Sequence, residues 1–316
     1  MGVKMKYYIG IDGGGTKTQY ALFDENKNLI SSVFTGGSNH ENLEGSFSEA
    51  ADIIHEGITN LLKENGLEYK DIEHTLMGLA GIDHPYQHDA MVDELEERGY
   101  SRFSIYNDGF IVTKAGTDKK AAIGYNCGTG TCCNSIDSRG NMLQIGGFGD
   151  LSGDAGNGSW IAIRAFRLVY DEICLARHKS LITKLFTEKF GVKPERDEFL
   201  ATIALLMGLK QEEYTRGLID IFFDAANAGD EVVLESIEEM ADRGADFIAA
   251  HTKLQQFDDE VVDVVLSGSI HTKLPADIYI ERLMEKARAK SLKKLNFIKL
   301  TGPPVMGCIN WMLEDK

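Results

Sequence analysis

Two turns rich in glycine and threonine contain the residues best suited to binding a charged ligand. The first turn comprises Asp12, Gly13, Gly14, Gly15, Thr16, Lys17 and Thr18, and the second comprises Gly128, Thr129, Gly130 and Thr131. Because glycine has no Cβ atom, several backbone N–H groups can approach one anion, and threonine hydroxyls add further donors. We therefore expect both turns to bind nucleotide phosphates, and Asp12 to hold Mg²⁺ directly or through water. A purely structural hairpin with an Asx turn at Asp12 is the alternative.

The two turns belong to an internal repeat. Ile9 to Phe34 and Ile123 to Ile145 each predict a strand, a glycine turn, a second strand, a polar turn and a third strand. A dinucleotide fold or a P-loop requires a helix immediately after the glycines. Lys17 to Phe23 instead alternates and is rich in Thr, Tyr and Phe, which favours a strand. The pattern excludes both of those nucleotide folds and indicates two related domains.

Asp108 is the strongest candidate for a general base. It follows the apolar run Phe103 to Asn107 and precedes a helix-like run. A carboxylate at the carboxyl end of a strand faces the crevice where α/β folds bind ligands, and there it can accept the proton of an attacking hydroxyl. The N-cap of the following helix is the alternative role. Together with two phosphate turns, Asp108 indicates phosphoryl transfer from ATP to a small hydroxylated molecule.

A third glycine-rich segment runs from Gly146 to Gly158 and holds six glycines. A hydrophobic core does not need so many glycines, so we expect the backbone here to approach a ligand closely. A flexible surface loop is the alternative.

The cysteines and the histidine near these segments do not predict a metal site. Cys127, Cys132 and Cys133 surround the second turn, but their C-x4-C-C spacing lacks a fourth zinc ligand. We therefore expect them to be small buried side chains. His40 lies in a polar loop, and we expect it to contact substrate or to be exposed rather than to bind metal.

The remaining pattern predicts the elements that must position these residues. Apolar residues spaced by three and four predict a helix over residues 47–61, and residues 181–250 are almost entirely helical in pattern. Short apolar runs at 75–80, 103–106 and 261–266 predict strands, the last of them buried and parallel.

Two further helices are predicted with a defined buried face. One is capped by Asp154 or Asn157. Its apolar stripe consists of Ile163, Phe166, Tyr170 and Ile173. The other begins at Pro303 and Pro304. Its inward residues are Met306, Ile309 and Met312.

The length and net charge of the chain limit the number of domains and the kinds of partner that we expect. The chain has 316 residues and a formal net charge of −16. This length predicts two domains, which we place at 1–117 plus 303–316 and at 118–302, with a hinge near residue 117. The negative charge disfavours nucleic acid and acidic membranes as partners. The lack of a secretory or membrane-spanning pattern and the odd number of cysteines predict a cytoplasmic protein with reduced thiols. A homodimer is expected.

These motifs resemble those of the sugar kinase and actin-like ATPase superfamily, specifically the N-acetylglucosamine kinase branch of the BadF/BadG/BcrA/BcrD ATPase-like family. The resemblance runs through most of the chain. The segments that match the family's motifs are Asp12–Thr18 and Gly128–Thr131 (phosphate), Val265–Ser269 (adenosine), Ser38–His40 (sugar contact), Asn107–Asp108 (catalytic Asp) and Gly153–Gly156, which is similar to Gly-Asp-Glu-Gly.

The resemblance implies an α/β fold of two ribonuclease-H-like lobes with a cleft between them and a large helical insertion in the second lobe. It further implies ATP and Mg²⁺ as cofactors and phosphorylation of the 6-hydroxyl of an N-acetylated amino sugar. Asp108 would then be the base, and Asn39 and Asp154 would hold sugar hydroxyls. The other residues expected at the ligands are Ser38, His40, Asn107, Gly128, Thr129, Phe148 and Gly149 for the sugar, and Gly268 and Ser269 for the nucleotide. Sugar binding is expected to close the lobes and exclude water.

One departure from the family pattern bears on the substrate. Ala155 stands where the last motif has Glu, so a carboxylate is missing. A sugar that carries a lactyl carboxylate would gain from this loss, which makes N-acetylmuramic acid a second candidate beside N-acetylglucosamine.

Two other functions remain as alternatives. An ATPase activator of a 2-hydroxyacyl-CoA dehydratase type system needs a Cys-Ala-Ala-Gly-Thr-Gly type segment, which Cys127 to Gly130 does not match. A sugar-sensing regulator without catalysis usually adds a DNA-binding helix pair, whereas here the first strand begins almost at once.

Overall fold

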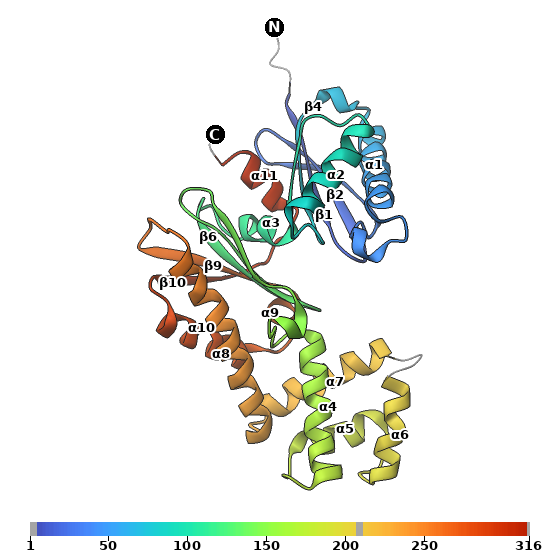
Figure 1. The fold of residues 1–316 in the computed structure, drawn as a ribbon, viewed down its shortest axis with the longest axis vertical. Helices are drawn as coiled ribbons and strands as arrows, with labels where there is room; N and C mark the ends of the chain where they lie inside the picture. Colours follow the sequence, from blue (N-terminus) through green and yellow to red (C-terminus); the bar gives the residue numbers. More distant parts are fainter. Residues whose placement is uncertain (1–4, 207–210, 315–316) are drawn as a thin grey trace. The chain divides into compact units, whose positions relative to one another are not determined.

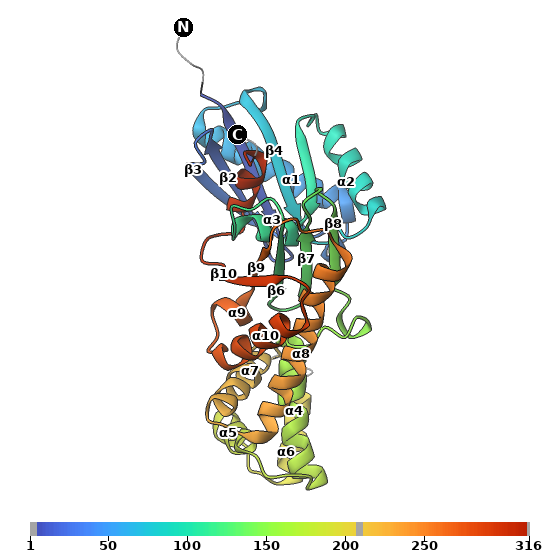
Figure 2. The same cartoon turned by 90° about the vertical axis from the view of Figure 1, so that its left-hand side faces the viewer.

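The fold is α/β, with two five-stranded sheets and helices packed against them (Figures 1 and 2). The computed structural model describes residues 5–206 and 211–314. Contacts between Cα atoms divide the chain into two units, which we describe one at a time: unit 1 is residues 1–124, 134–142 and 300–316, and unit 2 is residues 125–133 and 143–299. None of the helices in the described residues is both long enough and apolar enough to cross a membrane.

The first sheet has the strand order β3-β2-β1-β4-β5. Its strands are β1 (Tyr7–Gly13), β2 (Lys17–Asp24), β3 (Leu29–Gly36), β4 (Ile72–Leu79) and β5 (Phe103–Asn107). The first three strands form antiparallel hairpins, whereas β4 and β5 run parallel to β1. The carboxyl ends of β1, β4 and β5 therefore meet at one edge of the sheet, as the sequence predicts for Asp12 and Asp108.

Side chains of the first sheet alternate between two cores. Ile9 and Ile11 pack with helices α1 (Ser46–Asn65) and α2 (Pro85–Glu97). Tyr8, which directly precedes Ile9 in sequence, packs instead with α3 (Asp108–Ala115) and α11 (Met306–Met312). Because successive side chains of a strand point to opposite faces, the helices cover both sides of the sheet (Figure 1).

The second sheet repeats the topology of the first. Its strands are β6 (Ala122–Cys127), β7 (Thr131–Ile136), β8 (Met142–Gly146), β9 (Val261–Ser267) and β10 (Lys294–Lys299). Taken from its other edge, their order is β8-β7-β6-β9-β10, which matches β3-β2-β1-β4-β5 strand for strand. The structure confirms the internal repeat that the two glycine turns predict, and it confirms β9 as a buried parallel strand.

A group of helices is inserted between β8 and β9, as expected (Figure 2). It consists of α4 (Gly158–Leu175), α5 (Leu181–Phe190), α6 (Arg196–Leu206), α7 (Gln211–Asn227) and α8 (Glu231–Leu254). Residues 207–210 of the predicted helical stretch lie outside the described residues. Two more helices, α9 (Ser269–Thr272) and α10 (Asp277–Lys290), follow β9, and α10 packs along α8.

The predicted buried face of α4 needs correction, whereas that of α11 is confirmed. In α4 the core side chains include Ile161, Ala165 and Val169, and Ile163 is 51% exposed. In α11, Ile309 is buried in the core, and Met306 and Met312 are partly buried and pack against it. The error in α4 arises because spacing of three or four residues defines a stripe but not which of two neighbouring stripes meets the rest of the protein.

Candidate active site

The first glycine turn joins β1 to β2 and is held on two sides. The Gly14 N–H donates to the Lys17 carbonyl (3.1 Å), which closes the hairpin and leaves Gly15 and Thr16 exposed at its tip. The carbonyl of Gly13 accepts from the Ala80 N–H (2.8 Å), just after β4, and the Gly14 carbonyl accepts from Ser38. The exposed tip therefore rests on a fixed base, as a phosphate-binding turn requires.

Ser38, Asn39 and His40 lie directly beside this turn. Thr18 Oγ1 donates to Ser38 Oγ at 2.9 Å, which ties the loop to β2. Asn39 caps the short helix His40–Asn42 through its side-chain oxygen, which accepts from the Glu41 N–H (3.0 Å). The cap uses only the side-chain oxygen, so the amide nitrogen of Asn39 keeps two N–H donors that could bind a ligand.

His40 is buried, so the expectation that it is simply exposed is wrong. Its ring is 7% exposed and stacks on Phe47 with 3.9 Å between centroids. Burial lowers the pKa of the imidazole, and the charges of Glu41 and Asp83 oppose that shift. Among the described residues, Nδ1 of His40 has no hydrogen-bond partner. A buried nitrogen without a partner is costly, and a ligand hydroxyl or amide would satisfy it.

Asn107, and not Asp108, supplies the side-chain cap of α3. The Asn107 side-chain oxygen accepts from the Gly109 N–H (2.9 Å) and its Nδ2 donates to Asp83 Oδ1 (3.0 Å). The N-cap role that was the alternative for Asp108 is therefore filled by Asn107.

Two carboxylates act on the carboxyl group of Asp108 at this edge of the first sheet. Burial raises the pKa of Asp108 to about 7, and the negative charges of Asp12 and Asp83 add to the rise. Burial also raises the pKa of Asp12 to about 6, while the ammonium of Lys17 opposes it. A carboxyl group with a pKa near neutrality is suited to accept a proton from a hydroxyl.

Asp83 is a candidate that the sequence analysis missed. It lies four residues after the end of β4, between Gly81 and the helix α2, and its charge acts on both Asp108 and His40. The signal was present, because the argument that places Asp12 and Asp108 after their strands applies equally to the residues after β4.

The donor set at this edge fits Mg²⁺. Carboxylate oxygens are hard ligands, and Mg²⁺ commonly uses one or two of them together with phosphate oxygens and water. The described residues contain no cluster of three or more His, Cys, Asp or Glu side chains arranged to hold a metal by themselves. Asp12, which lies at the base of the first glycine turn, would hold Mg²⁺ that arrives with a nucleotide.

The second glycine turn is anchored within unit 2 by the start of α4 and the end of β9. The Gly158 N–H donates to the Gly128 carbonyl (2.8 Å), and the Gly128 N–H donates to Gly130 (2.9 Å). Gly268 has φ +83°, and a Cβ there would lie 2.2 Å from the Cys127 carbonyl oxygen. Only glycine allows β9 to end so close to the turn.

A cavity of about 460 Å³ brings several predicted nucleotide residues together. Gly128 and Thr129 of the turn and Ser269 of α9 all line it. Helix α7 contributes Thr215, Arg216 and Ile219, which the sequence analysis missed. The helical pattern of that stretch predicts an element but gives no sign of which residues reach a ligand.

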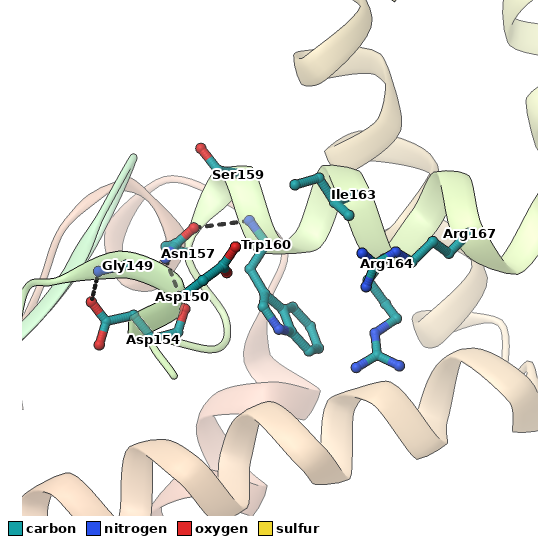
Figure 3. A pocket seen from close by; sticks show the side chains of 9 residues that line it. All are labelled: Gly149, Asp150, Asp154, Asn157, Ser159, Trp160, Ile163, Arg164 and Arg167. Carbon is teal, nitrogen blue, oxygen red and sulfur yellow. Dashed lines mark hydrogen bonds between the residues drawn. The ribbon is translucent and has the colours of Figure 1, made fainter. Parts of the chain in front are cut away.

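The glycine-rich loop after β8 is built around Asp154. Asp154 is 4% exposed, and its Oδ2 accepts from the Gly147 and Gly149 N–H groups, both at 2.9 Å. Its Oδ1 accepts from Ser152 Oγ (2.7 Å). Asn157, rather than Asp154, caps α4 by accepting from the Trp160 N–H (2.9 Å) (Figure 3). The carboxylate of Asp154 therefore orders the loop.

Arg243 of α8 holds the same loop from outside. Its Nε donates to the Gly153 carbonyl at 3.0 Å, and its Nη2 donates to the Ser152 carbonyl. The guanidinium also lies over the Phe247 ring, with 4.8 Å to the centroid. A charged donor on two loop carbonyls restrains the backbone immediately before Asp154.

The cysteines around the second turn are mostly buried, as expected. Cys127 and Cys133 are buried, Cys132 is half-buried, and all five cysteines of the chain are free thiols. Cys127 Sγ donates to the Gly156 carbonyl (3.0 Å), and burial raises its pKa to about 12. Cys127 is thus a neutral packing residue that ties the turn to the glycine-rich loop.

The model of the BadF/BadG/BcrA/BcrD ATPase family matches residues 9–294. The chain belongs to this family. The match includes both glycine turns, Asp108 and the glycine-rich loop, and it confirms the resemblance drawn from the motifs.

Two curated relatives are sugar kinases by name. The N-acetylmuramic acid/N-acetylglucosamine kinase of Clostridium acetobutylicum is 30% identical over 164 residues, which are 52% of this chain and 53% of that protein, so the match spans about half of its length. The N-acetyl-D-glucosamine kinase of Dictyostelium discoideum is 26% identical over 325 residues and 98% of both chains.

Solved structures confirm the fold. A crystal structure from Chromobacterium violaceum, named provisionally as an N-acetylglucosamine kinase, has a TM-score of 0.67 at 20% identity and covers 99% of this chain and 100% of its own. A ROK family glucokinase from Streptomyces griseus has a TM-score of 0.55 at 15% identity, with 99% and 100% coverage. The chain has the actin-like ATPase fold of the sugar kinases.

Proposed function

We propose that this protein is an ATP-dependent kinase that phosphorylates the 6-hydroxyl of an N-acetylated amino sugar, N-acetylglucosamine or N-acetylmuramic acid. The names of the two curated relatives and the ATPase family support the reaction class. The observation that carries the mechanism is the carboxyl group of Asp108, whose pKa is raised to about 7. The absence of disulfides among the five cysteines is compatible with a cytoplasmic location.

The donor side consists of the two glycine turns and the cavity in unit 2. The N–H groups and hydroxyls from Gly13 to Thr18 and from Gly128 to Thr131 would bind the phosphates, and Gly268 and Ser269 would border the adenosine. Mg²⁺, held by Asp12, would neutralise charge on the phosphate oxygens when it is bound.

The acceptor side consists of the residues around Asp108. The Asn39 amide and His40 Nδ1 offer hydrogen bonds to sugar hydroxyls or to the acetamido group, and Asp154 positions the loop that carries Phe148 and Gly149. Ser38 and Asn107 act through their neighbours, because Ser38 fixes the loop and Asn107 orients Asp83.

In the reaction, the sugar 6-oxygen attacks the γ-phosphorus while Asp108 accepts the hydroxyl proton. The bond between the γ-phosphorus and the bridging oxygen breaks, and ADP leaves with the electron pair. A base with a pKa near 7 is half ionised at neutral pH and can still return its proton to solvent after turnover.

An ADP-release screen over N-acetylglucosamine, N-acetylmuramic acid, glucosamine and glucose tests the function. We expect turnover of at least one N-acetylated sugar and a loss of at least about 100-fold in kcat for Asp108→Asn, with sugar binding largely kept. Asp89→Asn, at an exposed carboxylate of α2, is the matched control and should behave as wild type. Near-normal kcat in Asp108→Asn would show that the base lies elsewhere. Sugar binding without any ADP release would indicate a sensor instead of a kinase.

A further inference from the structure

Unit 2 contains a second cavity, of about 390 Å³, between the glycine-rich loop and the first turns of α4 (Figure 3). Its wall on α4 is formed by Trp160, Ile163, Arg164 and Arg167. Ile163 belongs to the stripe that the sequence analysis assigned to the core, and its 51% exposure follows from its place on this wall. Ile163 thus differs from Phe166 of the same stripe, which stacks on Phe199 inside the helical group.

Charge is segregated along the cavity. Asp150 and Asp154 lie at the end formed by the loop, and Arg164 and Arg167 lie at the other end, with Trp160 between them (Figure 3). The carboxylate of Asp154 already accepts three hydrogen bonds from its own loop, so its charge is compensated. A ligand that fits this arrangement has neutral polar groups at one end and an anionic group at the other.

The two guanidinium groups differ in their availability. Arg164 pairs with Glu239 of α8 and lies over the Trp160 ring, with 4.7 Å to the centroid, so it is fixed in place. Arg167 forms no ion pair or hydrogen bond with any other side chain in the described part of the chain. Arg167 can therefore bind an external carboxylate through its fork of N–H donors without first breaking an internal pair.

The cavity adjoins the nucleotide cavity of the same unit, because Ser159 lines both. Ala155, at the far side of Asp154 in sequence, is buried and adds no further negative charge to the loop. We therefore expect the occupant of this cavity to be a small molecule next to the nucleotide. Because residue 155 is alanine, the glycine-rich loop has no carboxylate there that would repel the anionic group of this molecule.

We propose that this cavity binds the carboxylate of a 3-O-lactyl substituent, with Arg167 as the principal ligand and Arg164 as its support. The protein would then prefer N-acetylmuramic acid to N-acetylglucosamine. This inference rests on the amino-sugar kinase function proposed above. The apolar surface of Ile163 would contact the methyl group of the lactyl ether, which N-acetylglucosamine lacks.

The test measures kcat/KM for both sugars in the full-length protein and in Arg167→Gln, Arg167→Lys and Arg164→Gln. The ratio of the N-acetylmuramic acid value to the N-acetylglucosamine value should fall about tenfold in Arg167→Gln, equivalent to about 1.4 kcal/mol. Arg167→Lys should restore part of it, because the charge remains. Arg177→Gln, at an exposed arginine of the same unit that pairs with Asp171, is the matched control and should leave the ratio unchanged. Thermal unfolding of each variant verifies its fold.

A second probe separates charge from shape. The methyl ester of N-acetylmuramic acid keeps the lactyl group without its charge, so its kcat/KM should not respond to Arg167→Gln. An unchanged selectivity ratio in both arginine variants, or an equal loss for both sugars, would overturn the inference while leaving the kinase function intact. A wild-type protein that phosphorylates none of the sugars would instead refute the function and the inference together.

Discussion

At Asp108, three causes act on one carboxyl group. Burial raises its pKa most, and the charges of Asp12 and Asp83 raise it further, to about 7. The unfolded chain has an ordinary carboxyl pKa near 3.8 at this position, so the folded protein holds the proton more tightly than the unfolded chain does. The folded protein therefore loses stability as the pH rises from about 4 to about 7, and the loss stays constant above pH 7. This cost is tolerated at a site of proposed catalysis.

The raised pKa predicts the pH dependence of activity. Asp108 must lose its proton to act as the base, so kcat/KM should fall about tenfold per pH unit below pH 7. Asp83→Asn removes one negative neighbour and should shift the midpoint to lower pH. Rates measured from pH 5 to pH 9 with N-acetylglucosamine test both statements, because the sugar does not ionise in this range. A flat profile down to pH 5 would contradict the role of Asp108.

At the scale of elements, the loop after β8 and the end of β9 are restrained by contacts with other parts of unit 2. Arg243 of α8 binds the carbonyls of Ser152 and Gly153, and Gly268 allows β9 to reach the second phosphate turn. Neither restraint is local in sequence. Each one can be removed by a single substitution that leaves the strands and helices themselves unaltered.

Arg243→Ala should loosen the glycine-rich loop. We expect faster hydrogen exchange over residues 146–156 and a fall of about tenfold in kcat/KM for the sugar, with a smaller effect on the KM for ATP. Arg282→Ala, at a half-exposed arginine of α10 that pairs with Glu238, is the control. Exchange and kinetics that stay at wild-type values would show that the loop does not depend on this clamp.

Gly268→Ala should disrupt the cavity that we propose binds the nucleotide. The added Cβ would lie 2.2 Å from the Cys127 carbonyl oxygen, so β9 or the second turn must move. Gly229→Ala is a matched control, because Gly229 has the same φ of +83° but open space around it. Both variants bear the strain of a positive φ, which is larger at Gly268 because its ψ of 161° places it in a region that essentially only glycine occupies. Nucleotide affinity should therefore fall only in Gly268→Ala, by at least about tenfold, and equal losses in the two variants would point to backbone strain alone.

At the scale of the whole molecule, the residues proposed for one reaction are divided between the two units. Asp12, His40 and Asp108 belong to unit 1, whereas Thr129 and Asp154 belong to unit 2. In-line transfer requires the γ-phosphate and the acceptor oxygen to be in contact and water to be excluded from them. Both ATP and the sugar must therefore be bound before the reactive site is formed.

ATP hydrolysis without sugar should therefore be slow. We expect ADP release in the absence of sugar below about 1% of the rate with saturating N-acetylated sugar. Small-angle scattering provides an independent measure, and the radius of gyration should decrease when the sugar is added. Rapid hydrolysis in water together with an unchanged radius would contradict the dependence on sugar.

The sequence alone determined the features that depend on neighbouring residues. The glycine turns, the alternating strands after them and the repeat of that pattern are set by backbone freedom and by a period of two, and the structure confirms them. Asp108 was found in the same way, from its place after a strand. The family followed from the short motifs, and the family model that matches residues 9–294 confirms it.

Only the tertiary structure decided which residues meet. It brought Asp83 to Asp108 and His40, surrounded the Asp154 carboxylate with donors from its own loop, and turned Ile163 of α4 outward toward Arg167. Burial, pKa shifts and the choice between two neighbouring helix faces depend on contacts between segments far apart in the chain. Periodicity carries no information about those contacts, because the desolvation and Coulomb energies that decide them arise only when the segments pack together.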